Sequence, residues 1–187
     1  MKKIILFLQL IFSIGMSAQT TVESVQVADM DEGAPICGKS IDLHKRILQA
    51  YNCDSTLIVF ACDTTKKGKN TDTGYLYSLE ANTLEVQWQK SLKLSLSKLY
   101  GVCSKGVLLS STLKSTGKSL LTLSDTKTGR SLWTQYLYPV YFNDSLDIVI
   151  GLEKVGGSKT YAYRLSTGML LWDAEIPMTK NVGWKDA

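Results

Sequence analysis

The stretch Tyr161-Ala-Tyr-Arg-Leu-Ser-Thr-Gly168, followed four residues later by Trp172, contains the pattern that decides the fold. It combines an aromatic strand, a polar turn that ends in Thr-Gly, and a second apolar strand that carries Trp. The three tryptophans of this pattern are 45 and 39 residues apart, a period typical of repeat architectures. The two earlier copies are Leu76–Leu84 leading to Trp88 and Leu121–Gly129 leading to Trp133.

Each turn has a Thr in the same place, namely Thr83, Thr128 and Thr167. A Thr hydroxyl can bond to local backbone, and the following Gly129 or Gly168 tolerates the left-handed dihedrals of a tight turn. Leu84 stands where the other repeats have Gly, so we expect the first turn to have a different shape. Each Trp supplies a large flat surface for packing against the next repeat, and its indole N–H needs a partner there.

From residue 46 onward, short apolar runs bounded by Gly, Asn, Asp, Ser and Lys predict β-strands, four in each repeat. Four short antiparallel strands per 40 to 50 residues is what a β-propeller blade requires. The strand Leu57–Cys62 runs apolar without alternation, as expected when both faces of a blade are covered. We predict an all-β fold, a partial propeller of about three blades that forms an arc and not a closed ring. The blades are predicted at 46–91, 97–137 and 138–175, with the start of a fourth at 180–187. Trp184 is then either an exposed residue of an incomplete blade or an adhesive contact.

The N-terminus has the order of a secretory signal peptide. Lys2 and Lys3 precede an apolar run from Ile4 to Met16, and Ser17-Ala18 supplies small residues before Gln19. Residues 1–18 are therefore predicted to be cleaved, which places the protein in the periplasm or outside the cell. The alternative is an uncleaved N-terminal anchor. No later apolar run approaches the roughly 18 residues of a membrane helix.

Charge excludes nucleic acid as an expected partner. Loss of residues 1–18 removes two lysines and lowers the formal charge from +4 to +2, and basic and acidic residues are mixed along the chain. Residues 19–45 form a lead-in segment without a clear period, and Ser40–Leu48 is predicted as either a short helix or the approach to a strand. The acidic turn at 29–32 is expected to be solvated and not a calcium loop. The lysine-rich stretch 63–73 is expected to be an exposed hairpin loop, with an anionic ligand as the alternative.

The four cysteines are open to two interpretations. Export permits disulfides, and Cys37–Cys53 or Cys37–Cys62 would be the bridge. The other interpretation, favoured by the apolar surroundings of Cys53, Cys62 and Cys103, is buried free thiols in strands. Metal binding is not expected, because the chain has no C-x-x-C pair and a single histidine, His44.

The stretch Leu76–Trp88 resembles the repeat of the quinoprotein (PQQ-like) β-propellers, whose blades carry an L-Y-A-L-D-A-x-T-G…W phrase. The second half of that phrase is matched most closely by Ser166–Trp172. The resemblance covers about residues 46–174, and the Asp of the phrase corresponds to Glu80, Asp125 and Arg164. It implies a ring of seven or eight blades, so we expect further blades or another chain to be needed for closure.

The resemblance covers both quinone-dependent dehydrogenases and non-catalytic periplasmic scaffolds. As it implies, the enzymes hold their cofactor with calcium, a stacking Trp and in some cases a disulfide between adjacent cysteines. This chain lacks an adjacent Cys pair, a C-x-x-C-H haem signature and a nucleophile–His–acid set. We therefore predict a non-catalytic exported module, without cofactor or metal, that binds protein or glycan through loops at 63–73 and 111–118. The alternatives are a part of a quinone-dependent dehydrogenase and an extracytoplasmic sensor domain.

Overall fold

The computed structural model of the chain describes residues 22–28, 36–65 and 67–176. The predicted signal peptide, the acidic turn at 29–32 and the fourth unit with Trp184 lie outside these residues. In the described part every regular element is a β-strand, as expected for an all-β fold. The strands are β1 (Val22–Ala28), β2 (Ile36–Ile41), β3 (Arg46–Cys53), β4 (Thr56–Thr64), β5 (Asn70–Glu80), β6 (Val86–Lys93), β7 (Ser97–Cys103), β8 (Gly106–Thr112), β9 (Ser119–Ser124), β10 (Ser131–Tyr136), β11 (Tyr138–Asn143), β12 (Ile148–Leu152), β13 (Lys159–Arg164) and β14 (Leu170–Glu175).

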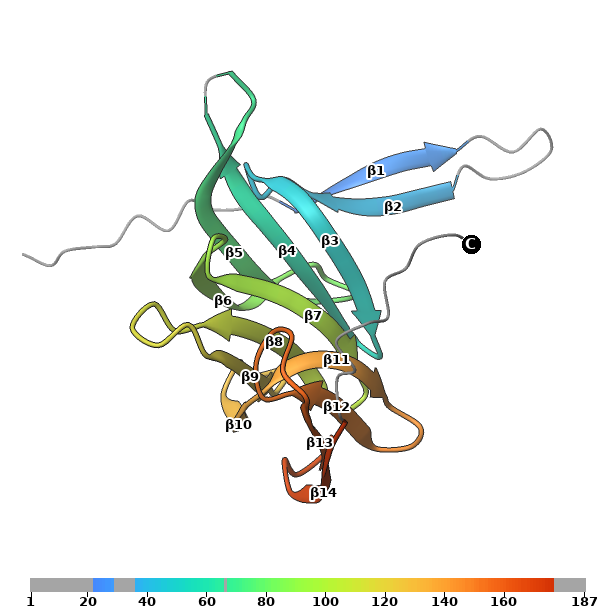
Figure 1. Cartoon of the computed structure of the whole chain (residues 1–187). Helices are drawn as coiled ribbons and strands as arrows, with labels where there is room; N and C mark the ends of the chain where they lie inside the picture. Colours follow the sequence, from blue (N-terminus) through green and yellow to red (C-terminus); the bar gives the residue numbers. More distant parts are fainter. Residues whose placement is uncertain (1–21, 29–35, 66, 177–187) are drawn as a thin grey trace, which may run out of the picture.

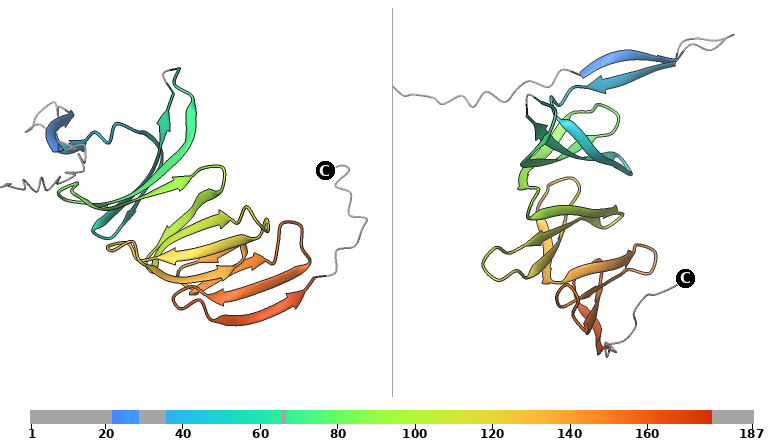
Figure 2. Two further views of the ribbon diagram at one scale, coloured as in Figure 1. Left: turned by 90° about the vertical axis from the view of Figure 1, so that its left-hand side faces the viewer. Right: turned by 45° about the horizontal axis from the view of Figure 1, so that its top comes forward.

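Twelve of these strands form three four-stranded antiparallel sheets, each in simple chain order. The first sheet is β3-β4-β5-β6, the second is β7-β8-β9-β10, and the third is β11-β12-β13-β14. Figure 1 and Figure 2 show the sheets stacked one after another in chain order, without closure into a ring. Consecutive hairpins within a sheet and face-to-face stacking between sheets are the construction of propeller blades, so the predicted open arc is confirmed.

Two apolar layers hold the three sheets together. Between the first and second sheets lie Ile58, Phe60, Leu76, Leu99 and Val107, all at least 95% buried. Between the second and third sheets lie buried residues that include Leu108, Leu121, Leu123, Val149 and Leu165. The second sheet contributes to both layers, because Leu99 and Val107 belong to the first layer and Leu108, Leu121 and Leu123 to the second. Runs without alternation are therefore explained by burial on two sides.

The lead-in segment differs from expectation. Strands β1 and β2 form a separate two-stranded antiparallel hairpin, drawn in blue in Figure 1. Of the two alternatives for Ser40–Leu48, the short helix is wrong: strand β2 extends to Ile41, a turn follows, and β3 begins at Arg46. The carboxylate of Asp42 accepts a hydrogen bond from the backbone N–H of His44 (2.7 Å), and His44 has a positive φ of 51°. This Asx-type turn competes with helix formation, which explains the outcome.

Candidate functional site

The three repeated tryptophans occupy equivalent places in the three sheets. Strand pairing aligns Trp88 with Ser78 and Ile58 in the first sheet. It aligns Trp133 with Leu123 and Leu108 in the second sheet. In the third sheet it aligns Trp172 with Ala162 and Ile150. Residues directly opposite one another in antiparallel strands project from the same face. Trp88 and Trp133 therefore lie on the faces that point toward the second and third sheets, and Trp172 lies on the equivalent face of the third sheet.

A β-bulge precedes each of these tryptophans. The pairing skips Gln87, Leu132 and Leu171, the residues immediately before Trp88, Trp133 and Trp172. A bulge bends the strand locally and changes the direction of its side chains. The same irregularity in all three sheets shows that the placement of the Trp depends on backbone shape as well as on residue type.

Trp88 binds the turn of the second sheet. Its indole Nε1–H donates to the carbonyl of Thr126 at 2.7 Å, and the hydroxyl of Ser78 donates to the same carbonyl at 2.7 Å. The ring lies flat against Gly129, because a Cβ at that glycine would be only 2.9 Å from Trp88 Cδ2. The glycine is thus required twice, by its φ of 67° and by the close approach of the indole ring.

Trp133 makes the same contact with the turn of the third sheet. Its Nε1–H donates to the carbonyl of Leu165 at 2.8 Å, and a Cβ at Gly168 would lie 2.7 Å from Trp133 Cγ. Gln135 adds a hydrogen bond from its side-chain amide to the carbonyl of Gly168, at 2.9 Å. Thr126 and Leu165 are the second residues of their turns, and the glycines are the fifth. One docking geometry therefore joins each sheet to the next.

The expectation that the first turn has a different shape is wrong. Leu84 adopts a φ of 61°, close to the 67° of Gly129 and the 69° of Gly168. Its backbone N–H donates to the carbonyl of Glu80 at 2.8 Å, just as that of Gly168 donates to the carbonyl of Arg164 at 2.8 Å. The hydrogen bonds of the turn therefore hold a leucine in the left-handed region. Unlike the turns at Gly129 and Gly168, this turn has no indole ring of the described residues packed against it.

Carboxylates stabilise all three turns, but from different positions. Asp125 accepts hydrogen bonds from the backbone N–H and the hydroxyl of Thr128, at 2.7 and 2.8 Å. These donors hold the pKa of Asp125 below its ordinary value. Glu80 accepts from the N–H of Thr83 in the same way, with the same effect on its pKa. In the third turn Arg164 offers no carboxylate, and Asp147 takes over from the β11–β12 connection by accepting from the N–H and hydroxyl of Ser166, at 2.7 and 2.6 Å.

The third sheet leaves its Trp without such a contact within the described residues. We use the term trailing face for the face of the third sheet that carries Ile150, Ala162, Leu171 and Trp172. Trp172 is 44% exposed and Leu171 43% exposed. Ile150 is partly exposed, although its counterparts Ile58 and Leu108 are completely buried. The trailing face is thus equivalent to the faces at the two internal junctions, but Ile150, Leu171 and Trp172 on it are in contact with solvent.

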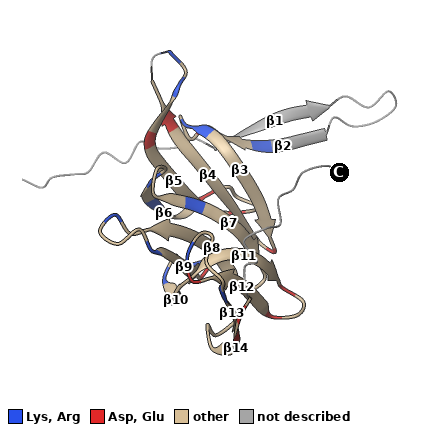
Figure 3. Ribbon diagram, viewed as in Figure 1, with Lys and Arg blue, Asp and Glu red and all other residues tan. Residues whose placement is uncertain are grey.

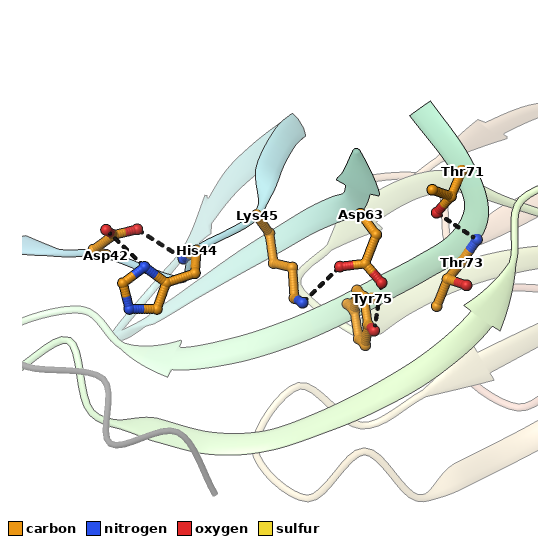
Figure 4. Close-up of polar contacts among 7 residues, drawn as sticks. All are labelled: Asp42, His44, Lys45, Asp63, Thr71, Thr73 and Tyr75. Atoms are coloured by element: carbon orange, nitrogen blue, oxygen red, sulfur yellow. Dashed lines mark hydrogen bonds and ion pairs between the residues drawn. The ribbon is translucent and has the colours of Figure 1, made fainter. Parts of the chain in front are cut away.

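The opposite end of the arc is covered by the chain itself. Leu43, from the turn between β2 and β3, packs on the outer face of the first sheet against Val59, Ala61, Tyr77 and Leu79. Lys45 then forms an ion pair with Asp63 (Nζ to Oδ1, 2.6 Å) and lies 4.6 Å from the ring centroid of Tyr75. The hydroxyl of Tyr75 donates to the other carboxylate oxygen of Asp63, at 2.8 Å (Figure 4).

This polar cluster shifts the pKa values of its members in the directions expected of mutual stabilisation. The hydrogen bonds from Lys45 and Tyr75 lower the pKa of Asp63. The hydrogen bond to Asp63 raises the pKa of Lys45. The pKa of Tyr75 is also raised, chiefly because its hydroxyl donates to the Asp63 carboxylate. The cluster fastens the segment before β3 onto the first sheet, and its side chains are already satisfied by one another.

Three cysteines are free thiols in the structure: Cys62 and Cys103 are buried, and Cys53 is partly exposed. The thiol of Cys53 donates to the carbonyl of Cys103 at 3.2 Å, and the thiol of Cys103 donates to the carbonyl of Gly106 at 3.4 Å. Burial raises the pKa of both thiols, which favours the unreactive protonated form. The side chain of Cys37 lies outside the described part, so any bridge that involves it stays a prediction.

The remaining polar groups offer little that would hold a ligand. A shallow pocket of about 330 Å³ is lined by Asp72, Thr73, Ser91, Leu92 and Lys93. Asp72 already accepts hydrogen bonds from the N–H and the hydroxyl of Ser95, at 2.6 and 3.0 Å. Among the described residues no group of three or more His, Cys, Asp or Glu could hold a metal ion. Figure 3 shows Lys and Arg, and Asp and Glu, at scattered positions over the sheets and their connections.

Within residues 22–28, 36–65 and 67–176 there is no helix with the length and apolarity needed to cross a membrane.

Comparison with known proteins finds no matching family model and no matching curated protein. Solved structures with a similar backbone include a europium-containing methanol dehydrogenase, with 14% identity, a TM-score of 0.43, and coverage of 68% of this chain and 31% of that one. They also include the β-propeller domain of the Trilobed protease from Pyrococcus furiosus, described as an open velcro topology, with 6% identity, a TM-score of 0.46, and coverage of 72% and 44%. BamB from Moraxella catarrhalis matches with 16% identity, a TM-score of 0.30, and coverage of 67% and 50%. The chain thus spans between about a third and half of the length of these proteins.

Proposed function

We propose that this protein is an exported, non-catalytic β-propeller module that acts by binding another protein. The observation that carries this proposal is the trailing face of the third sheet. On this face Leu171 and Trp172 are 43% and 44% exposed, and Ile150 is partly exposed beside them. Large contiguous apolar surfaces on folded proteins mark interaction sites. An aromatic anchor such as Trp172 is the residue type that contributes most to binding at protein interfaces.

Export is proposed from the order of Lys2-Lys3, the apolar run Ile4–Met16 and Ser17-Ala18. It is tested by expressing the full chain in a Gram-negative host and sequencing the N-terminus of the mature protein. We expect the mature protein to begin at Gln19 and to be recovered outside the cytoplasm. A cytoplasmic protein that retains Met1 would contradict this part of the proposal.

Binding is tested by placing a photo-crosslinking amino acid at Leu171 in cells that naturally make the protein. We expect a single adduct of defined mass, lost when Trp172→Asp is introduced into the same chain. The matched control places the crosslinker at Lys98, an exposed residue of strand β7, where no adduct is expected. Equal adduct formation from both positions would show nonspecific contact and contradict the proposal.

The non-catalytic part is tested with the cofactor of the enzymes that the repeat resembles. Purified protein is titrated with pyrroloquinoline quinone in the presence and absence of calcium, and the quinone absorbance is recorded. We expect no saturable, calcium-dependent binding. Tight binding that disappears on addition of a chelator would favour a part of a quinone-dependent dehydrogenase over a binding module.

A further inference from the structure

The two internal junctions of this molecule show which partner groups the Trp-bearing face of a sheet contacts. At each of them the indole ring lies on a glycine of positive φ, and the indole N–H donates to the carbonyl three residues before that glycine. The carbonyl acceptors are those of Thr126 and Leu165, at 2.7 and 2.8 Å. Each junction therefore has two parts. One sheet supplies a Trp that follows a bulge, and the next sheet supplies a five-residue turn that ends in Gly.

The trailing face reproduces one half of that geometry. The bulge at Leu171 and the alignment of Trp172 with Ala162 and Ile150 correspond position by position to the first and second sheets. The exposure differs, because Trp172 is 44% exposed and Ile150 is partly exposed, whereas their counterparts lie within junctions. Within the described residues the indole N–H of Trp172 has no acceptor, and both Gly turns of the repeat are already covered, by Trp88 and by Trp133.

A second copy of the chain does not supply the missing half. Its exposed end is the first sheet, where Leu84 takes the place of the glycine. A Cβ at the equivalent positions 129 and 168 would approach the indole ring to within 3 Å, closer than real contacts allow. The outer face of that sheet is also occupied by Leu43 and by the Lys45–Asp63 ion pair.

We propose that the trailing face is a docking site for a four-stranded antiparallel sheet of a different polypeptide, which places a glycine turn on Trp172 and a backbone carbonyl at its indole N–H. The proposal deepens the proposed function, on which it rests for the existence of a protein partner. It specifies the partner by chemistry: an outer hairpin whose turn ends in a Gly of positive φ, with an apolar face toward Ile150 and Leu171. Equivalence with the two established junctions supports the choice, because the matching faces of the first and second sheets are each covered by the next sheet of the same chain.

The test uses the full chain extended after Ala187 by a protease-cleavable linker and a second copy of residues 138–176. The indole N–H resonance of Trp172 is assigned by its loss in a Trp172→Phe variant. We expect this resonance to shift and its hydrogen exchange to slow on the order of tenfold, the effect of one hydrogen bond worth about 1 to 1.5 kcal/mol. After cleavage of the linker, the added sheet is expected to co-elute with the main chain in size-exclusion chromatography.

The matched control replaces the glycine at position 168 of the added copy with leucine. Leu84 shows that a leucine can occupy this turn position at a φ of 61°, so the added sheet retains its turn while its contact with the indole ring is blocked. We expect protection of Trp172 and co-elution both to be lost. Protection that survives the substitution, or no protection in the unmodified extension, would overturn the inference.

Two further results keep the inference separate from the proposed function. If deletion of residues 177–187 exposes Trp172 further, the occupant is the chain itself and the inference is wrong. If the added sheet docks while no adduct forms in cells, the docking chemistry stands and the proposed function fails. If an adduct forms at Leu171 but the glycine of the added copy is irrelevant, the function stands and the inference fails.

Discussion

Trp133 and Trp172 occupy equivalent positions, but Trp133 lies within a junction and Trp172 is exposed. Comparing the two therefore isolates the contribution of the junction to stability. Trp133→Ala removes the ring from Gly168 and leaves the carbonyl of Leu165 without its donor. We expect a loss of about 3 kcal/mol in the free energy of unfolding. Trp172→Ala should cost less than about 1 kcal/mol, as for an exposed substitution.

The measurement is urea unfolding of both variants and of the parent protein. An unchanged m-value shows that the three transitions are comparable. Equal costs for the two substitutions would mean that the packing of Trp133 on the glycine turn contributes nothing to stability.

Glycine 168 permits a second comparison at this scale, against Gly117. Both have nearly the same φ, 69° and 67°, but only the Cβ of an alanine at 168 would overlap Trp133; at 117 no atom lies within 4 Å. Gly117→Ala should therefore cost about 1 kcal/mol, from backbone strain alone. Gly168→Ala should cost about 2 to 4 kcal/mol, since overlap with a packed ring adds to the strain. Thermal unfolding of both variants checks the difference, and similar melting temperatures would refute it.

The lead-in segment is held to the first sheet in part by the ion pair between Lys45 and Asp63. Because the pKa of Asp63 is lowered in the folded state, its contribution is present above the ordinary Asp value of 3.8 and is lost as the pH falls through the folded value. Asp63→Asn should reduce the free energy of unfolding by about 1 kcal/mol at neutral pH, with a smaller difference from the parent protein below pH 3.8. Unfolding measured between pH 3 and pH 8 tests this. A difference that stays constant across that range would exclude the ionised carboxylate as the cause.

At the level of elements, the strands of the three sheets could be predicted because short apolar runs bounded by turn residues indicate strands directly. Leu57–Cys62, for example, lies within β4. The β1–β2 hairpin could not be predicted, because residues 22–28 and 36–41 mix apolar and polar residues without a clear period and belong to no repeat. The shape of the Leu84 turn does not follow from residue type, because the hydrogen bonds of the turn hold a leucine in the left-handed region. Asp147, which replaces the missing carboxylate of Arg164, could not be identified from the repeat, since it lies in a different connection.

For the whole molecule, the arrangement of the three sheets predicts where apolar dyes bind. Leu171→Gln combined with Trp172→Gln should markedly reduce the fluorescence of a hydrophobic dye such as ANS in the folded protein. Val86→Gln, at an exposed position of the first sheet, should leave the fluorescence unchanged and serves as the control. Equal dye binding by the double variant and the parent protein would show that the trailing face is not the main exposed apolar surface.

The junction between a Trp and the following glycine turn also gives the stack a direction. Because its two halves differ, sheets can be added only in one orientation, and Leu84 together with Leu43 terminates the series at the first sheet. A duplicated copy of the second sheet, inserted between the second and third, would present a correct Trp on one side and a correct glycine turn on the other. The number of sheets in the stack can therefore be changed by design, except by addition at the first sheet. Each added sheet should increase the stability through one more nearest-neighbour interface.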